Sequence, residues 1–218
     1  TGVDYNHPDL KDNIMKNASD QVEGYDYANN DSDPMDDHGH GTHCAGIIAA
    51  QGNNDPNHGA DSGTRIVGVG PGLKIMPLKG LAATGCGEVA SLLNCLKYAV
   101  DNGAKVISNS WGIDKRKTDF DDILAYAADK GVVAVFAAGN SALDVIYSSP
   151  AGNPDVITVA ASNYQDRIAS FSNYGVGVDL AAPGGDCASM GGVDDYVLSA
   201  LAATHNAHFT PALGSYYT

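Results

Sequence analysis

The sequence lacks three features that would assign it to well-known classes of protein. It has no long run of apolar residues, although 44% of its residues are hydrophobic, so we expect no membrane-spanning helix. Basic residues are scarce: 12 lysines and arginines stand against 26 aspartates and glutamates, and the formal net charge is −14. Because a polyphosphate partner needs a basic face, this charge argues against nucleic-acid binding. Internal repeats, low-complexity tracts and linkers are also missing, and 218 residues suit one domain.

Cysteine is too rare for a scaffold built on disulfides. Only Cys44, Cys86, Cys95 and Cys187 occur in a chain of this length. On one shared helix Cys86 and Cys95 would lie ~13 Å apart, too far for a bond, so a bridge requires Cys86 to precede the helix and fold back. The pairing stays open. We expect Cys44 to be a small core residue with a free thiol.

The most informative stretch begins at His38 and reads H-G-H-G-T-H-C-A-G. It holds three imidazoles within six residues, and glycines flank His40 on both sides. The small apolar residues that follow indicate the start of a helix, and the glycines allow a close approach of the backbone. This setting suits a histidine that faces a cleft and accepts a proton.

The expected secondary structure alternates between strands and helices. Apolar runs predict strands, and stripes with a helical period, each ended by glycine, predict helices. Strands are expected at 74–78, 105–109, 132–138, 156–160 and 178–182, and helices at 88–102 and 119–130. This alternation predicts an α/β fold with a mostly parallel sheet flanked by helices on both faces.

The ends of two expected strands carry residues suited to a binding site. In open parallel sheets the ligand crevice lies at the carboxyl ends of the strands. Ser110, Trp111 and Gly112 end one expected strand, while Gly139 and Asn140 end a neighbouring one. Both segments should therefore open onto the same edge of the sheet.

Several blocks of sequence resemble the subtilisin-like serine proteases, and they occur in that family's order. The blocks are T-G-V-D and H-P-D-L within residues 1–10, H-G-T-H-C-A-G at 40–46, S-N-S-W-G at 108–112, A-A-G-N at 137–140, A-S-F-S-N-Y-G at 169–175 and L-A-A-P-G at 180–184. The resemblance implies that residues 1–218 belong to a peptidase S8 catalytic domain with a three-layer α/β sandwich. It also implies serine-type endopeptidase activity through an Asp/His/Ser triad.

The resemblance implies roles for individual residues. His40 would be the general base of the triad, and Asn140 would direct its side-chain amide at the oxyanion. The peptide would bind extended between two backbone edges. The implied substrate-binding residues are Gly85, Gly87, Ser110, Trp111, Gly112, Ala138 and Gly139. Trp111 is alternatively a core aromatic residue, and Asn140 alternatively a turn residue in the left-handed conformation.

Two members of the family's triad have no counterpart in this sequence. The catalytic Asp of the family directly precedes T-G-V-D, and its nucleophilic Ser lies in a G-T-S-M motif that residues 1–218 do not contain. We therefore expect the interior of a catalytic domain, truncated at both ends, which is inactive by itself. Ser189 follows Gly184 too soon to be the nucleophile, and no apolar helix follows it.

Calcium is the one cofactor that the resemblance implies. Asp9, in H-P-D-L, matches a calcium-binding aspartate of the family, which points to a structural ion. The acidic run at 31–37 is either solvated or a second cation site, since its alternate carboxylates could converge. The resemblance further implies polypeptide substrates, room for a propeptide, and a secreted or extracellular protein. The net charge argues against nucleic-acid partners, and the lack of a long apolar run argues against a membrane partner.

Two rival functions are open to test. His38, His40 and His43 resemble the H-x-H-x-D-H zinc motif of metallo-β-lactamase-like hydrolases, although Thr42 stands where that motif needs its Asp. A catalytically dead homologue that only binds peptides is the other rival. The residues that flank the chain would identify it.

Overall fold

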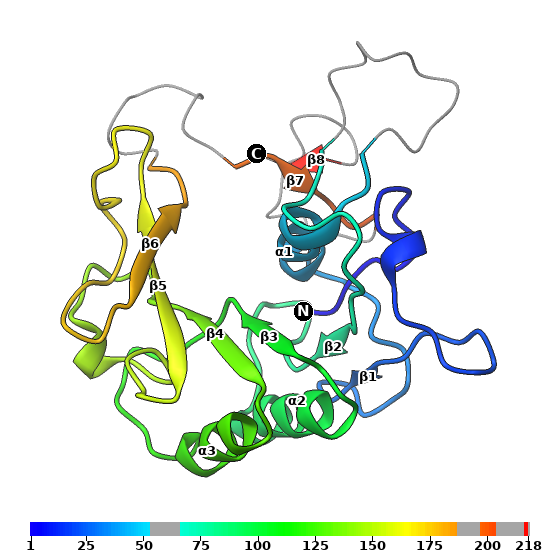
Figure 1. Cartoon of the computed structure of the whole chain (residues 1–218), viewed down its shortest axis with the longest axis horizontal. Coiled ribbons are helices and arrows are strands. Elements are labelled where there is room, and N and C mark those ends of the chain that lie inside the picture. Colours follow the sequence, from blue (N-terminus) through cyan, green and yellow to red (C-terminus); the bar gives the residue numbers. More distant parts are fainter. Residues whose placement is uncertain (53–65, 187–196, 204–215, 218) are drawn as a thin grey trace. The chain divides into compact units, whose positions relative to one another are not determined.

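The computed structural model describes residues 1–52, 66–186, 197–203 and 216–217 (Figure 1). The chain divides into two compact units, one formed by Thr1–Cys95 with Leu198–Thr218 and the other by Leu96–Val197. Each unit is described by itself. Cys187 and Ser189 lie outside the described residues.

The first unit is built around the helix α1 (His40–Ala49). The parallel pair β1 (Tyr25–Asp26) and β2 (Leu78–Lys79), the antiparallel pair β7 (Ser199–Ala200) and β8 (Tyr216–Tyr217), and the 3-10 helix η1 (Lys11–Asn13) complete it. A Cβ at Gly46 would lie 2.3 Å from Ser199 Oγ, so only glycine lets β7 approach the helix this closely. The Ser199 hydroxyl donates a hydrogen bond to the His43 carbonyl at 2.6 Å. This contact ties α1 to a strand far along the chain.

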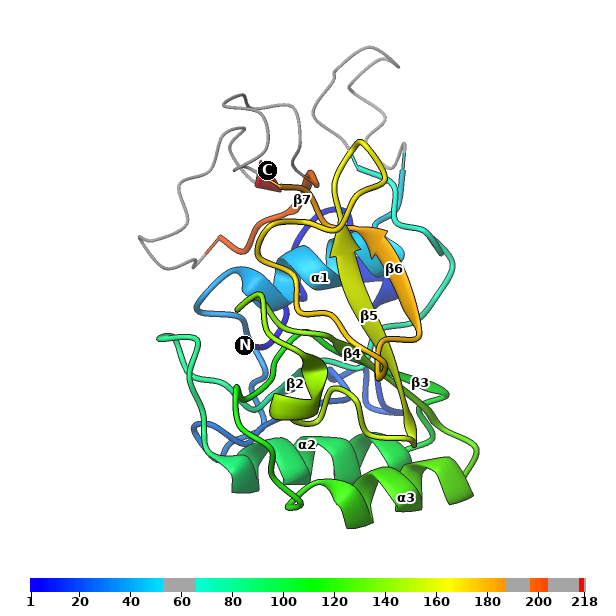
Figure 2. The same cartoon turned by 90° about the vertical axis from the view of Figure 1, so that its left-hand side faces the viewer.

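The second unit contains a four-stranded parallel sheet in the order β3-β4-β5-β6. The strands are β3 (Val106–Asn109), β4 (Val133–Ala137), β5 (Val156–Ser162) and β6 (Leu180–Pro183), accompanied by α3 (Asp121–Asp129) and the 3-10 helix η2 (Val145–Tyr147). The helix α2 (Val89–Asp101) leads into this unit. Alternation of strand and helix thus produces the predicted parallel α/β arrangement (Figure 2).

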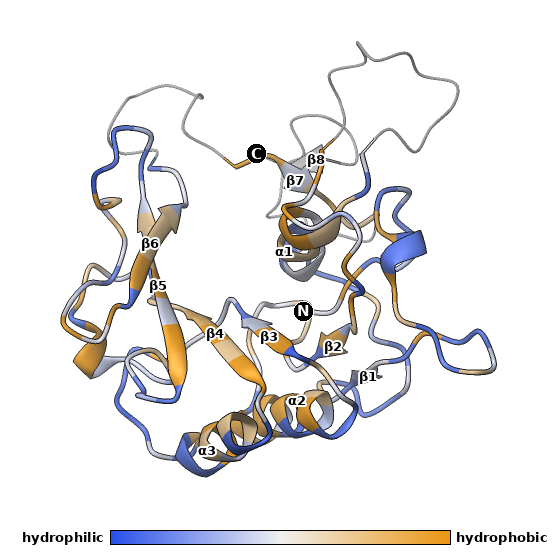
Figure 3. Ribbon diagram, in the orientation of Figure 1, coloured by the Kyte–Doolittle hydropathy of each residue, from blue (hydrophilic) through white to orange (hydrophobic). Residues whose placement is uncertain are grey.

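The two faces of this sheet differ in their cover. Val100 of α2 and Ala127 of α3 pack with Val132 and Ile107 on one face, and both views show α2 and α3 on that side (Figures 1 and 2). Residues of the strands are largely apolar (Figure 3). By the register of the strands, four of them lie on the opposite face. Side chains on it are exposed, namely Val106, Val133, Ile157 and Leu180, with exposed fractions between 36% and 60%.

Most expected elements are observed with ends shifted by one or two residues, but the strand predicted at 74–78 is wrong. Only Leu78 and Lys79 pair with β1, and Ile75 makes a single bridge to Ile14. Pro77 supplies the physical reason, because it has no N–H for a ladder hydrogen bond. Cys86 precedes α2 as a bridge would require, yet none of Cys44, Cys86 and Cys95 takes part in a disulfide.

Candidate active site

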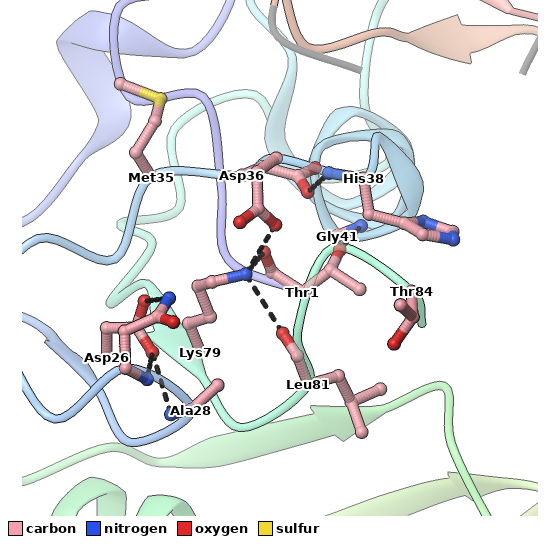
Figure 4. Close-up of polar contacts among 12 residues, drawn as sticks. Thr1, Asp26, Ala28, Met35, Asp36, His38, Gly41, Lys79, Leu81 and Thr84 are labelled. Atoms are coloured by element: carbon pink, nitrogen blue, oxygen red, sulfur yellow. Dashed lines mark hydrogen bonds and ion pairs between the residues drawn. The ribbon is translucent and has the colours of Figure 1, made fainter. Parts of the chain in front are cut away.

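Asp36 determines where the histidine-bearing helix begins. Its side chain is fully buried, and one carboxylate oxygen accepts hydrogen bonds from the N–H groups of His38 and Gly39 at 3.0 and 2.9 Å (Figure 4). The other oxygen accepts from the N–H and hydroxyl of Thr42 at 2.9 and 2.7 Å. A carboxylate at this end also interacts favourably with the helix dipole. Gly39 precedes the helix with φ of 108°, which glycine adopts without strain.

Side chains also satisfy the first amides of the helix, which have no partner within it. The N–H of Gly41 donates to the hydroxyl of Thr1 at 2.9 Å, and the N–H of His40 donates to Nδ1 of His38 at 3.4 Å. Hydrogen bonds to the side chains of Asp36, Thr1 and His38 therefore fix the main chain around His40.

The His40 imidazole is half-buried, and its Nε2 lies 3.7 Å from the Sγ of Cys44. Cys44 is itself half-buried and faces this ring, whereas we expected it in the core. Burial lowers the pKa of His40 below its usual 6.5, although the Asp36 carboxylate acts in the opposite direction. Burial likewise lowers the pKa of His38, and the neighbouring His40 adds to this effect. At neutral pH His40 is thus neutral and able to accept a proton.

The glycines at 85 and 87 serve the packing of the chain itself. Gly85 has φ of 76°, and a Cβ there would lie 3.1 Å from Nε2 of His38. A Cβ at Gly87 would lie 2.2 Å from the carbonyl oxygen of Gly80. These glycines were predicted from the sequence to form a substrate-binding edge. The structure places Gly85 beside the histidine segment, and that role stays a prediction.

Lys79 is a buried cation that sequence reasoning missed. Only 1% of it is exposed, and its ammonium donates to Asp37 at 2.6 Å, to the Leu81 carbonyl at 3.0 Å and to the Thr1 carbonyl at 3.2 Å (Figure 4). Each of its three protons therefore has a partner. No sequence pattern marks this lysine, because two of its partners are main-chain oxygens brought there by the fold.

The carboxylates of the acidic run at 31–37 interact with different partners. Asp33 accepts from the Tyr5 hydroxyl at 2.8 Å, Asp36 caps α1, and Asp37 pairs with Lys79. Within the described parts of the chain, no three His, Cys, Asp or Glu side chains form a group that could hold a metal ion. The histidines at 38, 40 and 43, all described, do not come together as such a group.

The second unit contains a cavity of about 230 Å³ at the carboxyl ends of β3 and β4. It brings together the six site residues that the sequence predicted in this unit: Ser110, Trp111, Gly112, Ala138, Gly139 and Asn140. Asp114 and Ser141 also line it, and the Ser141 hydroxyl donates to the Asp114 carboxylate at 2.5 Å. The expectation that both segments open onto one edge of the sheet agrees with this cavity.

Trp111 is at once a cavity wall and a core contact. Its ring centroid lies 5.4 Å from that of Phe120 and 5.1 Å from that of Phe136, and both phenylalanines are buried. The contact with Phe136 is edge-to-face, a favoured aromatic geometry. Ala138 also lines the cavity, although it is 2% exposed and packs with Val145.

Asn140 is exposed at the rim of this cavity. The left-handed residues of its turn are Gly139, with φ of 111°, and Ala142, with φ of 50°. The alternative interpretation of Asn140 as a left-handed residue is therefore wrong. Within the described residues its side-chain amide makes no hydrogen bond. The buried Asn173, for which no role was predicted from the sequence, bonds to residues on both sides of it.

A cavity at the carboxyl ends of neighbouring parallel strands is the usual place of a ligand site in an open α/β sheet. The chain belongs to the subtilase family, whose sequence model matches residues 1–217. It is 43% identical over 189 residues to the thermophilic serine proteinase of Bacillus sp. (strain AK1), covering 87% of this chain and 43% of that protein. Thermitase of Thermoactinomyces vulgaris is 41% identical over 184 residues, covering 84% of this chain and 60% of thermitase.

A solved structure confirms the subtilisin-like fold. The crystal structure of a cold adapted subtilisin-like serine proteinase superposes with a TM-score of 0.76 at 29% identity, covering 94% of this chain and 64% of that one. The chain thus spans about half the length of the thermophilic serine proteinase and of thermitase. Within the described ranges, no helix combines the length and apolarity needed to cross a membrane.

Proposed function

We propose that the protein is a serine-type endopeptidase in which His40 is the general base and Asn140 stabilises the oxyanion. The observation that carries this proposal is the cavity at β3 and β4, which is lined by Asn140 and five of the seven predicted substrate-binding residues in a member of the subtilase family. Two features of the site support it. The Asn140 amide is exposed, and the neutral His40 ring stands at the well-fixed start of α1.

In the proposed reaction a serine hydroxyl attacks the carbonyl carbon of the scissile peptide bond, and His40 takes the hydroxyl proton. The electron pair of the C=O bond moves to the oxygen, and Asn140 donates a hydrogen bond to that oxyanion. Collapse of the intermediate breaks the C–N bond, and His40 returns its proton to the leaving amine. Water then repeats the cycle and releases the acyl group. In subtilisin, losing one such oxyanion donor costs about 10²–10³-fold in kcat.

The substrate would lie extended beside Ser110–Gly112, with a side chain in the cavity. Main-chain hydrogen bonds to an added strand supply affinity, and the cavity supplies selectivity. Trp111 and the backbone of Ala138 and Gly139 would form the walls around that side chain. Gly85 and Gly87 would form the other edge, as the family resemblance implies.

The Ser and Asp of the triad are proposed to come from outside residues 1–218. Residues 1–218 alone should then show no peptidase activity. Turnover by these residues that a serine-directed inhibitor abolishes would mean that the nucleophile has been misplaced.

Asp9 is proposed as a ligand of a structural calcium ion. Asp9 as a whole is 2% exposed, and an acidic residue at a buried position fits a hard cation, which also takes main-chain and amide oxygens. The ion would hold the segment around Asp9, whose carbonyl accepts from the Gln51 N–H at 2.8 Å. Removing calcium with EGTA should lower the thermal midpoint of the wild type and leave that of Asp9→Asn unchanged. Equal responses of the two proteins would exclude this role.

The family resemblance also supports secretion and a propeptide, and polypeptides as the substrates. Fractionation of producing cells tests secretion directly. Finding the protein only inside the cells would contradict it.

The proposed function is tested by His40→Ala in the protein as its gene encodes it, with any residues before Thr1 or after Thr218 in place. We expect kcat to fall by at least about 10³-fold while the thermal midpoint changes little. His43→Ala, one turn along the same helix, is the matched control and should retain turnover. Full turnover in His40→Ala would end the assignment. Loss of activity in both variants, with tightly bound zinc, would favour the metal-dependent rival.

A further inference from the structure

We propose that Asn173 is a positioning residue that fixes the turn carrying Asn140, so that the Asn140 amide points at the oxyanion. This inference rests on the proposed function, because it assigns a supporting residue to the same site. Asn173 lies about thirty residues after the turn and does not line the cavity, so it acts through the backbone that it holds.

The Asn173 side chain accepts two hydrogen bonds from the C-terminal side of the turn. It is fully buried, and its Oδ1 accepts from the N–H groups of Ser141 and Leu143, each at 3.0 Å. Ser141 directly follows Asn140, and Leu143 follows the left-handed Ala142. One oxygen therefore holds two of the amides that come just after Asn140.

The same side chain donates two hydrogen bonds, one of them to the N-terminal side of the turn. Its Nδ2 donates to the Ala138 carbonyl at 2.9 Å and to the Ser148 hydroxyl at 3.0 Å. The main-chain N–H of Asn173 donates to the Gly139 carbonyl at 2.9 Å. A side-chain amide has two acceptor sites and two donor protons, and here all four are used.

Gly139 makes this contact possible. A Cβ at Gly139 would lie 2.4 Å from Nδ2 of Asn173, closer than any real contact, and φ of 111° is also unfavourable for other residues. The turn and Asn173 therefore fit each other only with glycine at 139. The sequence A-A-G-N marks the turn, but nothing in the sequence shows that its partner is Asn173.

This support matters because no hydrogen bond within the described residues holds the Asn140 side chain itself. The direction of its amide therefore depends on the main chain at 138–143. An oxyanion donor must lie about 2.7–3.1 Å from the developing charge and be fixed in advance. A turn released by loss of Asn173 would bind peptide through its other contacts but would stabilise the oxyanion poorly.

The test compares Asn173→Ala with Asn163→Ala in the protein as its gene encodes it. Asn163 is the matched control: it is 6% exposed, and its Oδ1 also accepts two loop amides, those of Gln165 at 3.0 Å and Arg167 at 3.1 Å, but it does not line the cavity. Both variants should lose stability. Only Asn173→Ala should lose kcat, by about 10²-fold, with KM changed less than about threefold.

Two further measurements keep the test decisive if Asn173→Ala folds poorly. Asn173→Asp retains the acceptor bonds to Ser141 and Leu143, so we expect its kcat to lie between those of Asn173→Ala and wild type. Amide hydrogen exchange at Ser141 and Leu143 should quicken at least about tenfold in Asn173→Ala and not in Asn163→Ala. Wild-type kcat per folded molecule in both Asn173 variants would overturn the positioning role.

Asn140→Ala separates this inference from the function on which it rests. Wild-type turnover in Asn140→Ala would refute the proposed oxyanion role. A large loss in Asn140→Ala together with normal kcat in Asn173→Ala would refute the positioning role alone. Losses in both, with faster exchange at Ser141 and Leu143, would support both.

Discussion

At the scale of the residue, the ammonium of Lys79 shows how hydrogen bonds offset the cost of burying a charge inside the first unit. Burying an ion is costly unless every hydrogen-bonding position finds a partner. Lys79 has one carboxylate and two main-chain carbonyls at hydrogen-bonding distance. Its loss would leave the two carbonyl groups without their donor and Asp37 without its counter-ion.

Lys79→Met should therefore lower the free energy of unfolding by about 3 kcal/mol. We place it at the low end of the range for broken buried pairs because the Asp37 side chain is 40% exposed and can be hydrated. Urea denaturation measures the change. Lys16→Met, which breaks the exposed pair with Asp20, is the control and should cost less than about 0.5 kcal/mol. Equal effects of the two substitutions would contradict this account.

Asp114 gives a second prediction at this scale, which concerns substrate choice. Among the described residues that line the cavity at β3 and β4, it is the one with a charged side chain. A lysine entering the cavity should be favoured over a glutamate. Because Asp114 is exposed, the attraction is weak, so Asp114→Asn should reduce kcat/KM for a lysine substrate relative to a leucine substrate by about twofold to fivefold. An unchanged ratio would show that the carboxylate does not face the bound side chain.

At the scale of the element, the start of α1 couples stability to pH. The pKa of His40 is lowered by burial, so below its usual value of 6.5 the unfolded chain binds a proton that the folded chain does not. The contribution of His40 to stability should thus be fully present above pH 6.5. The free energy of unfolding should fall as the pH decreases below that value. The pKa of Asp36 is also lowered: burial raises it, but its hydrogen bonds from Gly39, Thr42 and His38 outweigh that effect. Its contribution persists above 3.8 and is lost only at more acidic pH.

Thermal midpoints between pH 5 and pH 8 test this coupling in the wild type and His40→Gln. The wild-type midpoint should decrease from pH 7 to pH 5, and the decrease should be smaller in His40→Gln, which has no proton to bind there. Identical slopes would mean that the His40 pKa is not lowered by the fold.

Periodicity predicted the elements, because apolar residues that repeat at helical or strand spacing have to face a core. The predictions of a helix at 88–102 and of a strand at 132–138 were correct for this reason. The prediction of a strand at 74–78 was wrong because Pro77 interrupts the hydrogen-bond ladder. The cavity residues were predicted from their place after two parallel strands and from the family motifs. The roles of Lys79 and Asn173 were not predicted from the sequence, because most of their hydrogen-bond partners are main-chain groups that come close only in the folded chain.

At the scale of the whole molecule, the proposed mechanism joins residues of two units. His40 starts α1 in the first unit, and Asn140 lies at the rim of the cavity in the second. The mechanism requires both to act on one carbonyl group. Within the first unit, hydrogen bonds to Asp36 hold the main chain at the start of α1, where His40 lies. Within the second unit, hydrogen bonds to Asn173 hold the turn that carries Asn140.

The most direct test is a crystal structure of the gene-encoded protein with a peptide boronic acid, which mimics the tetrahedral intermediate. We expect one boronate oxygen within about 3 Å of the Asn140 amide and His40 Nε2 within hydrogen-bonding distance of the same adduct. We also expect the inhibitor side chain beside Trp111. An adduct that contacts only one of the two residues, or an imidazole 40 directed away from the inhibitor, would contradict the proposed mechanism.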